Sequence, residues 1–273
     1  MSRRNLRNVE KVSAGYCQNK NYVIMARQKG IIKLTGKIGD LSFYKSKDGY
    51  LAREKGGVDG ERIKKDPAFA RTRENGSEFG LAATSGKTLR DAFRPLMMRA
   101  ADNRITSRLT RLMSDIRKLD TTSDRGKRSV GVAIQNQPAK DLLKGFNFNN
   151  RSMLNAILYR PIALDTSTGE ITIEDLVPVN HIAAPPNSTH VSFTAAWGNV
   201  NFADGVSDLS LSSATNLALD GTMSTVTVTP SGSPTGTGTD VFILLVEFFQ
   251  EVNGTQYSLN DGGYNALNIV DVV

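Results

Sequence analysis

The chain has 273 residues, of which 39% are hydrophobic, so it can bury a core and is not a disordered polymer. Its longest apolar run, Val241 to Val246, is far shorter than the roughly 20 residues of a membrane-spanning helix. A single cysteine excludes a disulfide framework within the chain, and no apolar segment of a secretory signal follows the basic N-terminus. We therefore expect a cytoplasmic location by default; export by a leaderless route, or incorporation in an extracellular assembly, is left open.

Charge is divided unevenly along the chain. Residues 1–130 hold 30 Lys and Arg against 14 Asp and Glu, whereas residues 131–273 hold 4 against 13. No Lys or Arg follows Arg160. This asymmetry fits a polyanion partner for the basic half, charge pairing between subunits, or two domains with different solvated surfaces.

The N-terminal region begins with a predicted arm. Residues 1–29 are basic and lack a hydrophobic period, which is typical of an extended arm. Short strands follow over residues 30–55, with Asp48-Gly49 as a strong hairpin turn. Such a meander is marginal alone in water, so it must pack on its own helices, on the β half or on another subunit.

Three helices are predicted next, over residues 66–83, 87–101 and 102–118. Pro95 is expected to kink the second helix, and the third carries a regular apolar stripe. Residues 30–130 thus form a basic region of β-hairpin and helices, and we expect residues 131–153 to be a linker.

The C-terminal part reads as an acidic β-domain over residues 154–273. Turn residues at regular spacing separate its short strands, which favours an antiparallel β-sandwich. The predicted strands cover residues 156–163, 170–173, 189–196, 210–219, 224–229, 240–250, 256–259 and 266–272. The predicted fold class is therefore α+β, with N-terminal β-hairpins and helices followed by a C-terminal antiparallel β-sandwich.

Few residues indicate catalytic or metal chemistry. The segment Gly80 to Thr88 resembles a P-loop but has five residues between its glycines instead of four, and it follows a helix. A break between two helices, with Ser85 capping the second, explains it better. The only histidines, His181 and His190, match no metal-binding or nucleophile pattern, so we expect them at the surface or on edge strands. We predict no enzymatic activity and no cofactor.

The basic half offers two kinds of candidate surface. Cations of the arm and of the third helix could engage phosphates, although interleaved acids also fit a solvated face. The candidate polyanion-binding residues are Arg3, Arg4, Arg7, Arg104, Arg108, Arg111 and Lys118. Strand edges of the meander invite pairing with another chain. The candidate subunit contacts are Tyr22, Val23, Ile24, Ile31, Ile32, Phe43 and Tyr44.

Two stretches of sequence resemble a known family. ARQKGIIKLTGKIGDLSFYKSKDGYLAREKGGV at residues 26–58, continuing from Asp66 to Gly80, is similar to the opening of an uncharacterised bacterial domain-of-unknown-function family. EFFQEVNG at residues 247–254 is similar to its closing segment. The resemblance spans residues 25–273 and implies no catalytic or binding residue.

These observations favour a non-enzymatic structural protein that self-associates, into a homo-oligomer or a larger assembly, through its N-terminal arm and hairpins. The alternative is a polyanion-binding module, for nucleic acid or an acidic polymer, that uses the basic half. A carbohydrate- or surface-binding sandwich is less favoured, because Trp197 is the only tryptophan.

Overall fold

The computed structural model describes residues 25–54, 58–100 and 102–273. The chain divides into two compact units, Met1–Asp66 and Pro67–Val273, and each is described by itself. Most of the predicted arm, residues 1–24, lies outside the described residues. Within the described part of the chain, no helix is both long and apolar enough to cross a bilayer.

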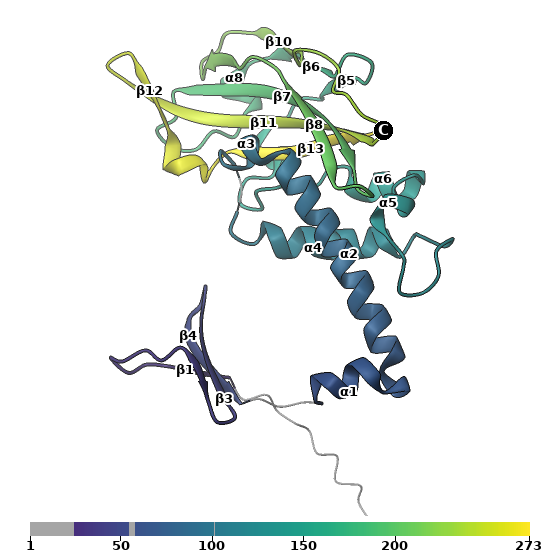
Figure 1. Cartoon of the computed structure of the whole chain (residues 1–273). Helices are drawn as coiled ribbons and strands as arrows, with labels where there is room; N and C mark the ends of the chain where they lie inside the picture. The colour runs from purple at the N-terminus through teal and green to yellow at the C-terminus, as the bar shows by residue number, and fades with distance from the viewer. Residues whose placement is uncertain (1–24, 55–57, 101) are drawn as a thin grey trace, which may run out of the picture. The chain divides into compact units, whose positions relative to one another are not determined.

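The first unit contains a four-stranded antiparallel sheet with the order β1-β4-β3-β2 (Figure 1). The predicted hairpin is confirmed: Ser46 pairs with Gly49 across a two-residue loop, and Gly49 has a φ of 108°, which glycine adopts most readily. One strand, β1, begins inside the predicted arm. The elements are β1 (Met25–Arg27), β2 (Gly36–Ile38), β3 (Leu41–Ser46), β4 (Gly49–Glu54) and α1 (Gly60–Lys65).

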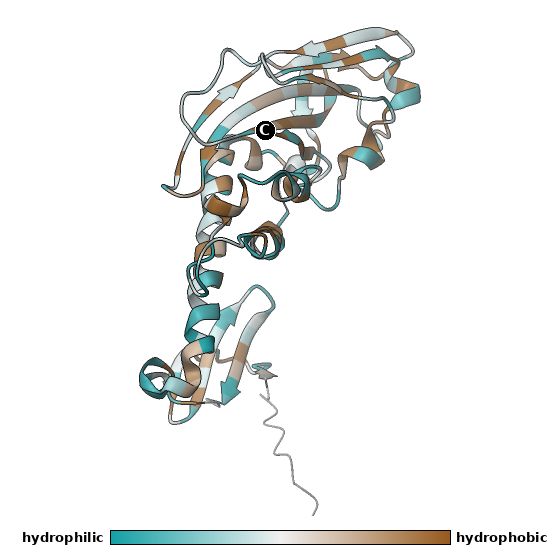
Figure 2. Cartoon of the chain, turned by 90° about the vertical axis from the view of Figure 1, so that its right-hand side faces the viewer, coloured by the Kyte–Doolittle hydropathy of each residue, from teal (hydrophilic) through white to brown (hydrophobic). Residues whose placement is uncertain are grey.

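The second unit has three layers: helices, a six-stranded antiparallel sheet and a three-stranded antiparallel sheet (Figures 1 and 2). The longest strands, β7 and β11, pair at the centre of the larger sheet; β8 and β9 extend it beside β7, and β12 and β13 beside β11. The smaller sheet has the order β10-β6-β5. The strands are β5 (Ala163–Asp165), β6 (Glu170–Leu176), β7 (His190–Asn201), β8 (Val206–Leu211), β9 (Thr215–Ala218), β10 (Ser224–Val228), β11 (Thr239–Val252), β12 (Thr255–Ser258) and β13 (Ala266–Val272).

The central strands are apolar on both faces because each face meets a different core. Val241, Ile243 and Leu245 of β11 belong to the core under the helices. Leu244 and Val246 of the same strand belong to the core shared with the three-stranded sheet. Alternate residues of a strand point to opposite faces, so the continuous apolar run of β11 is the sequence of a central strand.

The helical layer packs directly on the larger sheet. Gly198 of β7 lies so close to Phe93 that a Cβ atom there would come within 2.5 Å of the ring Cζ. The cores therefore join the helices and the C-terminal strands in one unit. The helices are η1 (Pro67–Phe69), α2 (Ala70–Ala92), α3 (Arg94–Met97), α4 (Ile105–Arg117), α5 (Val130–Ala133), α6 (Gln137–Leu143), α7 (Leu154–Ile157), α8 (Pro178–His181) and η2 (Leu259–Gly262).

The predicted break between the first and second helices is wrong. Helix α2 runs without interruption through Ser85 and Gly86. The Ser85 hydroxyl donates to the Leu81 carbonyl at 3.1 Å instead of capping a new helix. Gly86 is buried against α4: a Cβ atom there would lie 3.6 Å from Leu109, an ordinary van der Waals distance, and this packing offsets the low helix propensity of glycine. Pro95 lies in the first turn of the separate helix α3, so it does not kink a longer helix as predicted.

The stretch 131–153 differs from the predicted linker. It contains most of α5 and all of α6, and Ala139, Leu143 and Phe148 are fully buried. These helices are too short to show an amphipathic period, which is why the sequence reads as a linker.

Two of the predicted strands also differ from the structure. Residues 154–157 are helical and the strand begins only at Ala163. The segment 210–219 is divided between β8 and β9. The other predicted strands are confirmed within a few residues of their ends.

Candidate functional site

The register of the N-terminal sheet gives it two different faces. Directly paired residues of antiparallel strands lie on the same face, and neighbours along a strand alternate between faces. Phe43 therefore shares a face with its partner Ala52, and Leu41 shares it with Ile38. We call this the apolar face. Its side chains are Ala26, Ile38, Leu41, Phe43, Lys45, Tyr50, Ala52 and Glu54.

Within its own unit, the described residues do not bury the apolar face. None of the residues described between 26 and 54 is buried. Ile38 is 61% exposed and Leu41 is 45% exposed. A sheet that leaves such side chains in water gives up most of the hydrophobic stabilisation it could gain.

The opposite face is basic. Arg27, Lys37 and Arg53 lie on it together with Tyr44 and Leu51, and no strand residue of this face is acidic. The Arg53 guanidinium lies 5.7 Å from the centre of the Tyr44 ring, within the range of a cation–π interaction. We call this surface the basic face.

The strand register places the predicted subunit contacts on different surfaces of the N-terminal sheet. Phe43 lies on the apolar face, whereas Tyr44 lies on the basic face. Ile31 and Ile32 lie in the loop between β1 and β2 and are strongly exposed. Tyr22, Val23 and Ile24 lie outside the described residues. Sequence reasoning missed Ile38, Leu41, Arg27, Lys37 and Arg53, although counting alternate residues outward from the hairpin turn would have found Leu41 and Arg53.

The Gln28 side chain fixes the loop between β1 and β2. Its amide Nε2 donates to the Leu51 carbonyl at 3.0 Å, and its Oε1 accepts from the Leu34 N–H at 2.8 Å. These bonds attach the loop to β4, whereas Ile31 and Ile32 of the loop remain exposed to solvent.

Arg108, a predicted polyanion contact, is engaged within the fold. Its guanidinium donates to the carbonyls of Asn147 and Phe148 at 2.8 and 2.9 Å and pairs with Asp102 at 2.6 Å. Burial opposes ionisation of Asp102, but hydrogen bonds from the N–H groups of Asn150 and Arg104 and from Arg108 outweigh it and lower the pKa of the carboxyl. Arg108 thus ties α4 to the segment before α7.

The remaining described cations among the predicted polyanion contacts differ from Arg108 in their surroundings. Arg104 and Arg111 are exposed, and Lys118 pairs with Asp115 at 2.7 Å. Arg111 and Lys118 border a groove of about 560 Å³ beside α4. Arg3, Arg4 and Arg7 lie outside the described residues.

The histidines hold local structure. The His181 Nδ1 accepts from the Val177 N–H at 3.0 Å, and the His190 Nε2 lies 3.5 Å from a carboxylate oxygen of Glu251. Within the described residues, no group of three or more His, Cys, Asp or Glu side chains is arranged to hold a metal ion.

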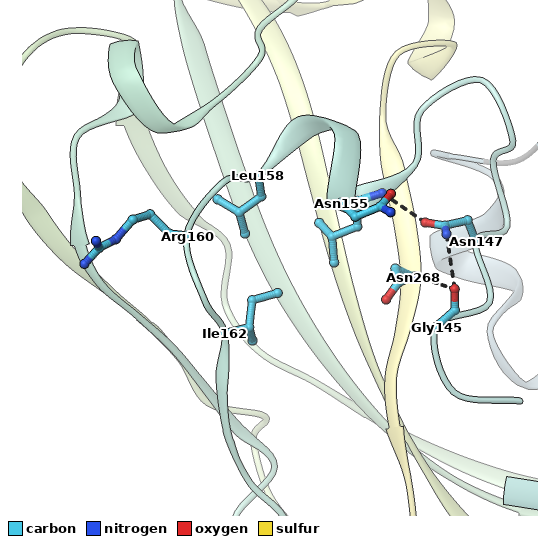
Figure 3. A pocket seen from close by; sticks show the side chains of 8 residues that line it. Gly145, Asn147, Asn155, Leu158, Arg160, Ile162 and Asn268 are labelled. Carbon is cyan, nitrogen blue, oxygen red and sulfur yellow. Dashed lines mark hydrogen bonds between the residues drawn. The ribbon is translucent and has the colours of Figure 1, made fainter. Parts of the chain in front are cut away.

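A cavity of about 330 Å³ lies beside β13 and α7 (Figure 3). Three polar side chains of its wall, Asn147, Asn268 and Arg160, already make hydrogen bonds within the fold. Asn147 and Asn268 both donate to the Gly145 carbonyl, at 3.1 and 3.0 Å, and the Asn147 Oδ1 accepts from the Leu154 N–H at 3.0 Å. Arg160 donates to the Glu174 carbonyl at 2.8 Å. The cavity therefore offers a ligand mostly apolar contacts.

Comparison of the chain with protein-family models, curated proteins and solved structures gives no significant match. The resemblance to an uncharacterised bacterial family stays a prediction, and the function has to be argued from the surfaces described above.

Proposed function

We propose that the protein is a non-enzymatic structural subunit that associates with further copies of itself through the apolar face of its N-terminal sheet. One observation carries the proposal: no residue described in the four-stranded sheet is buried, although one face presents Ile38, Leu41 and Phe43. A small sheet is stable in water when a second layer covers one of its faces. We infer that another copy supplies this layer.

The two charged residues of the apolar face support a second copy as the covering layer. Lys45 pairs with Tyr50 near the hairpin turn, whereas Glu54 pairs with Leu41 at the opposite end, and Phe43 lies between them. When two such faces stack around a two-fold axis that lies between the sheets, perpendicular to the strands and near Phe43, Lys45 of each copy comes opposite Leu41 of the other. Glu54 is then one strand spacing away, so the long Lys45 side chain can pair with its carboxylate. The face is therefore complementary to itself, as a symmetric dimer requires.

The energies indicate that these charges decide the assembly. Ile38, Leu41 and Phe43 are already partly covered, so burying the rest of each side chain contributes about 1 kcal/mol. Six such side chains in two copies are comparable with the cost of association, about 4–15 kcal/mol. A close repulsion between like charges adds several kcal/mol more against the complex. A single charge reversal should therefore be enough to dissociate it.

Sedimentation equilibrium over a concentration series tests the proposal. We expect the full-length chain to form oligomers, and Lys45→Glu or Glu54→Lys alone to shift it toward the monomer mass. The double variant with both changes should restore the oligomer, because it exchanges the charges without removing the pair.

A matched control lies on the same hairpin. Ser42→Glu adds a charge on the basic face beside Leu41 and should leave the mass distribution unchanged. A wild-type chain that stays monomeric at every concentration, or a double variant as dissociated as the single ones, would show that the apolar face is covered by something other than a second copy.

A further inference from the structure

We propose that the basic face of the N-terminal sheet binds single-stranded nucleic acid, with phosphates on Arg27, Lys37 and Arg53 and a base against the Tyr44 ring. This goes beyond self-association. The apolar and basic faces are opposite sides of one sheet, so a partner copy and a nucleic-acid strand can be bound at the same time.

The three cations are gathered by the strand register. Lys37 and Arg53 both pair with Ser42, from the two sides of β3, and are therefore about 10 Å apart, which is two strand spacings. Arg27 pairs with Leu51 and so lies diagonally from Arg53, at about 7–8 Å. All three are exposed, and in the described part of the chain none is paired with a carboxylate. Positive charges at such spacings follow a flexible phosphate backbone.

The aromatic ring among the cations favours a single strand over a duplex. Tyr44 is a diagonal neighbour of Arg53, whose guanidinium lies over its ring at 5.7 Å. Unpaired bases stack on tyrosine rings and on arginine planes, whereas the bases of a duplex are stacked on each other and cannot reach them. The apolar face also carries a tyrosine, Tyr50, with the Lys33 and Lys45 ammonium groups 5.9 and 5.6 Å from its ring centre, but the same face carries the acid Glu54, whereas the basic face has no acidic strand residue.

The acidic C-terminal region is a weaker candidate for the basic face. Most of its carboxylates already have partners within the chain: Asp165 accepts from Ser167, Asp208 from Thr235 and Asp240 from Asn199. Glu247 pairs with Arg99, and Asp271 pairs with Lys144 at 2.9 Å. To bind these carboxylates, the cations of another copy's basic face would have to displace the bonds that the carboxylates already make. The phosphates of a nucleic acid carry negative charges that need no such displacement.

Fluorescence anisotropy with a labelled oligothymidylate, measured across a salt series, tests the cations. The test variant is Arg27→Gln/Lys37→Gln/Arg53→Gln, and the matched control is Lys64→Gln/Lys65→Gln/Lys87→Gln, which removes the same charge from exposed residues elsewhere. The slope of log affinity against log salt should become shallower by about 2 in the test variant, at about 0.7 for each lost phosphate contact on a single strand. The control should keep the wild-type slope. No binding by the wild-type chain, or equal losses in the two triple variants, would overturn the proposal.

A second pair of variants separates nucleic acid from other polyanions. Tyr44→Leu should weaken binding of the oligothymidylate by about tenfold, Tyr44→Phe should retain it, and neither should change heparin binding. If Tyr44→Leu left oligothymidylate binding intact, the ligand would be a generic polyanion and the proposal would be wrong. The proposal would also be wrong if Arg27→Gln/Lys37→Gln/Arg53→Gln shifted the chain toward the monomer mass but bound oligothymidylate like the wild type. The basic face would then be a contact between subunits. The apolar-face variants report on self-association independently.

Discussion

Arg99 and Glu247 form an ion pair that joins the segment after α3 to the middle of β11, across 148 residues of sequence. The Arg99 Nε donates to a carboxylate oxygen of Glu247 at 2.8 Å, and Glu247 is only 4% exposed. Asn265 connects the same two segments through their backbones. Its Nδ2 donates to the Arg99 carbonyl at 2.9 Å, and its Oδ1 accepts from the Phe248 N–H at 3.0 Å. Burial raises the pKa of Glu247, and the charge and hydrogen bonds of Arg99 act against this rise.

We expect Arg99→Ala to lower the free energy of unfolding by about 2 kcal/mol at neutral pH, less than for a fully buried pair because Arg99 is partly exposed. The pKa of Glu247 then rises further, since nothing opposes burial. The loss of unfolding free energy in Arg99→Ala should be complete above the raised pKa of Glu247. It should shrink as the pH falls toward the unfolded pKa of about 4.3, because the Glu247 carboxyl becomes neutral. Denaturant titrations at several pH values measure this. Arg94→Ala, at an exposed neighbour, should cost little, and a cost of Arg99→Ala independent of pH would contradict the account.

The close approach of β7 to Phe93 leads to a second prediction. Gly198→Ala places a Cβ atom 2.5 Å from the ring of a fully buried phenylalanine. The ring has to move within a packed core, so the substitution should destabilise the protein by about 1–3 kcal/mol. Gly221→Ala is the control, because no atom lies within 4 Å of the added methyl. Equal midpoints of denaturation for the two variants would show that the helical layer does not pack on β7 as described.

Asp120 provides a third prediction, on acid stability. This buried carboxylate accepts from the N–H groups of Ser123 and Ser129 at 2.9 and 3.0 Å. Burial opposes its ionisation, but these bonds and the hydroxyls of Ser123 and Thr122 outweigh burial and hold the pKa of Asp120 far below its usual value.

A lowered pKa means that Asp120 contributes stability above its unfolded pKa of about 3.9, and that this contribution is lost as the pH falls below it. We expect Asp120→Asn to cost about 1–3 kcal/mol at neutral pH and progressively less in acid. Thermal unfolding between neutral and acid pH measures the difference. Asp124→Asn, whose side chain is 84% exposed, should follow the wild-type curve throughout. A cost of Asp120→Asn that persists undiminished in acid would argue against the lowered pKa.

Local patterns in the sequence predict much of this fold. The apolar run of β11 predicts a central strand, Asp48-Gly49 predicts the β3–β4 hairpin, and the stripe from Ile105 to Ile116 predicts α4. In each case the signal lies in residues that are neighbours in the sequence. Helix α2 passes through Gly86 because Leu109, distant in sequence, packs there, and no local signal reveals that contact.

The candidate surfaces depend on register more than on composition. Phe43 and Tyr44 are adjacent in sequence and both suggest an interface, yet they lie on opposite faces of one sheet. Arg108 reads as an exposed cation on a helix stripe, whereas carbonyls of Asn147 and Phe148, 39 and 40 residues away, occupy its guanidinium. Of the residues that form the two surfaces of the N-terminal sheet, sequence reasoning thus finds only Phe43 and Tyr44, and it does not place them on opposite faces.

Photo-cross-linking at the apolar face can show whether this face is the contact between copies. A photoreactive phenylalanine analogue replaces Phe43 in one preparation and Ser42 in another, and each is mixed with wild-type chain grown on heavy isotopes. We expect cross-links between light and heavy chains from position 43, with their sites among residues 38–54 of the partner copy, and few from position 42. Cross-links from position 43 that stay within one chain would contradict self-association through the apolar face.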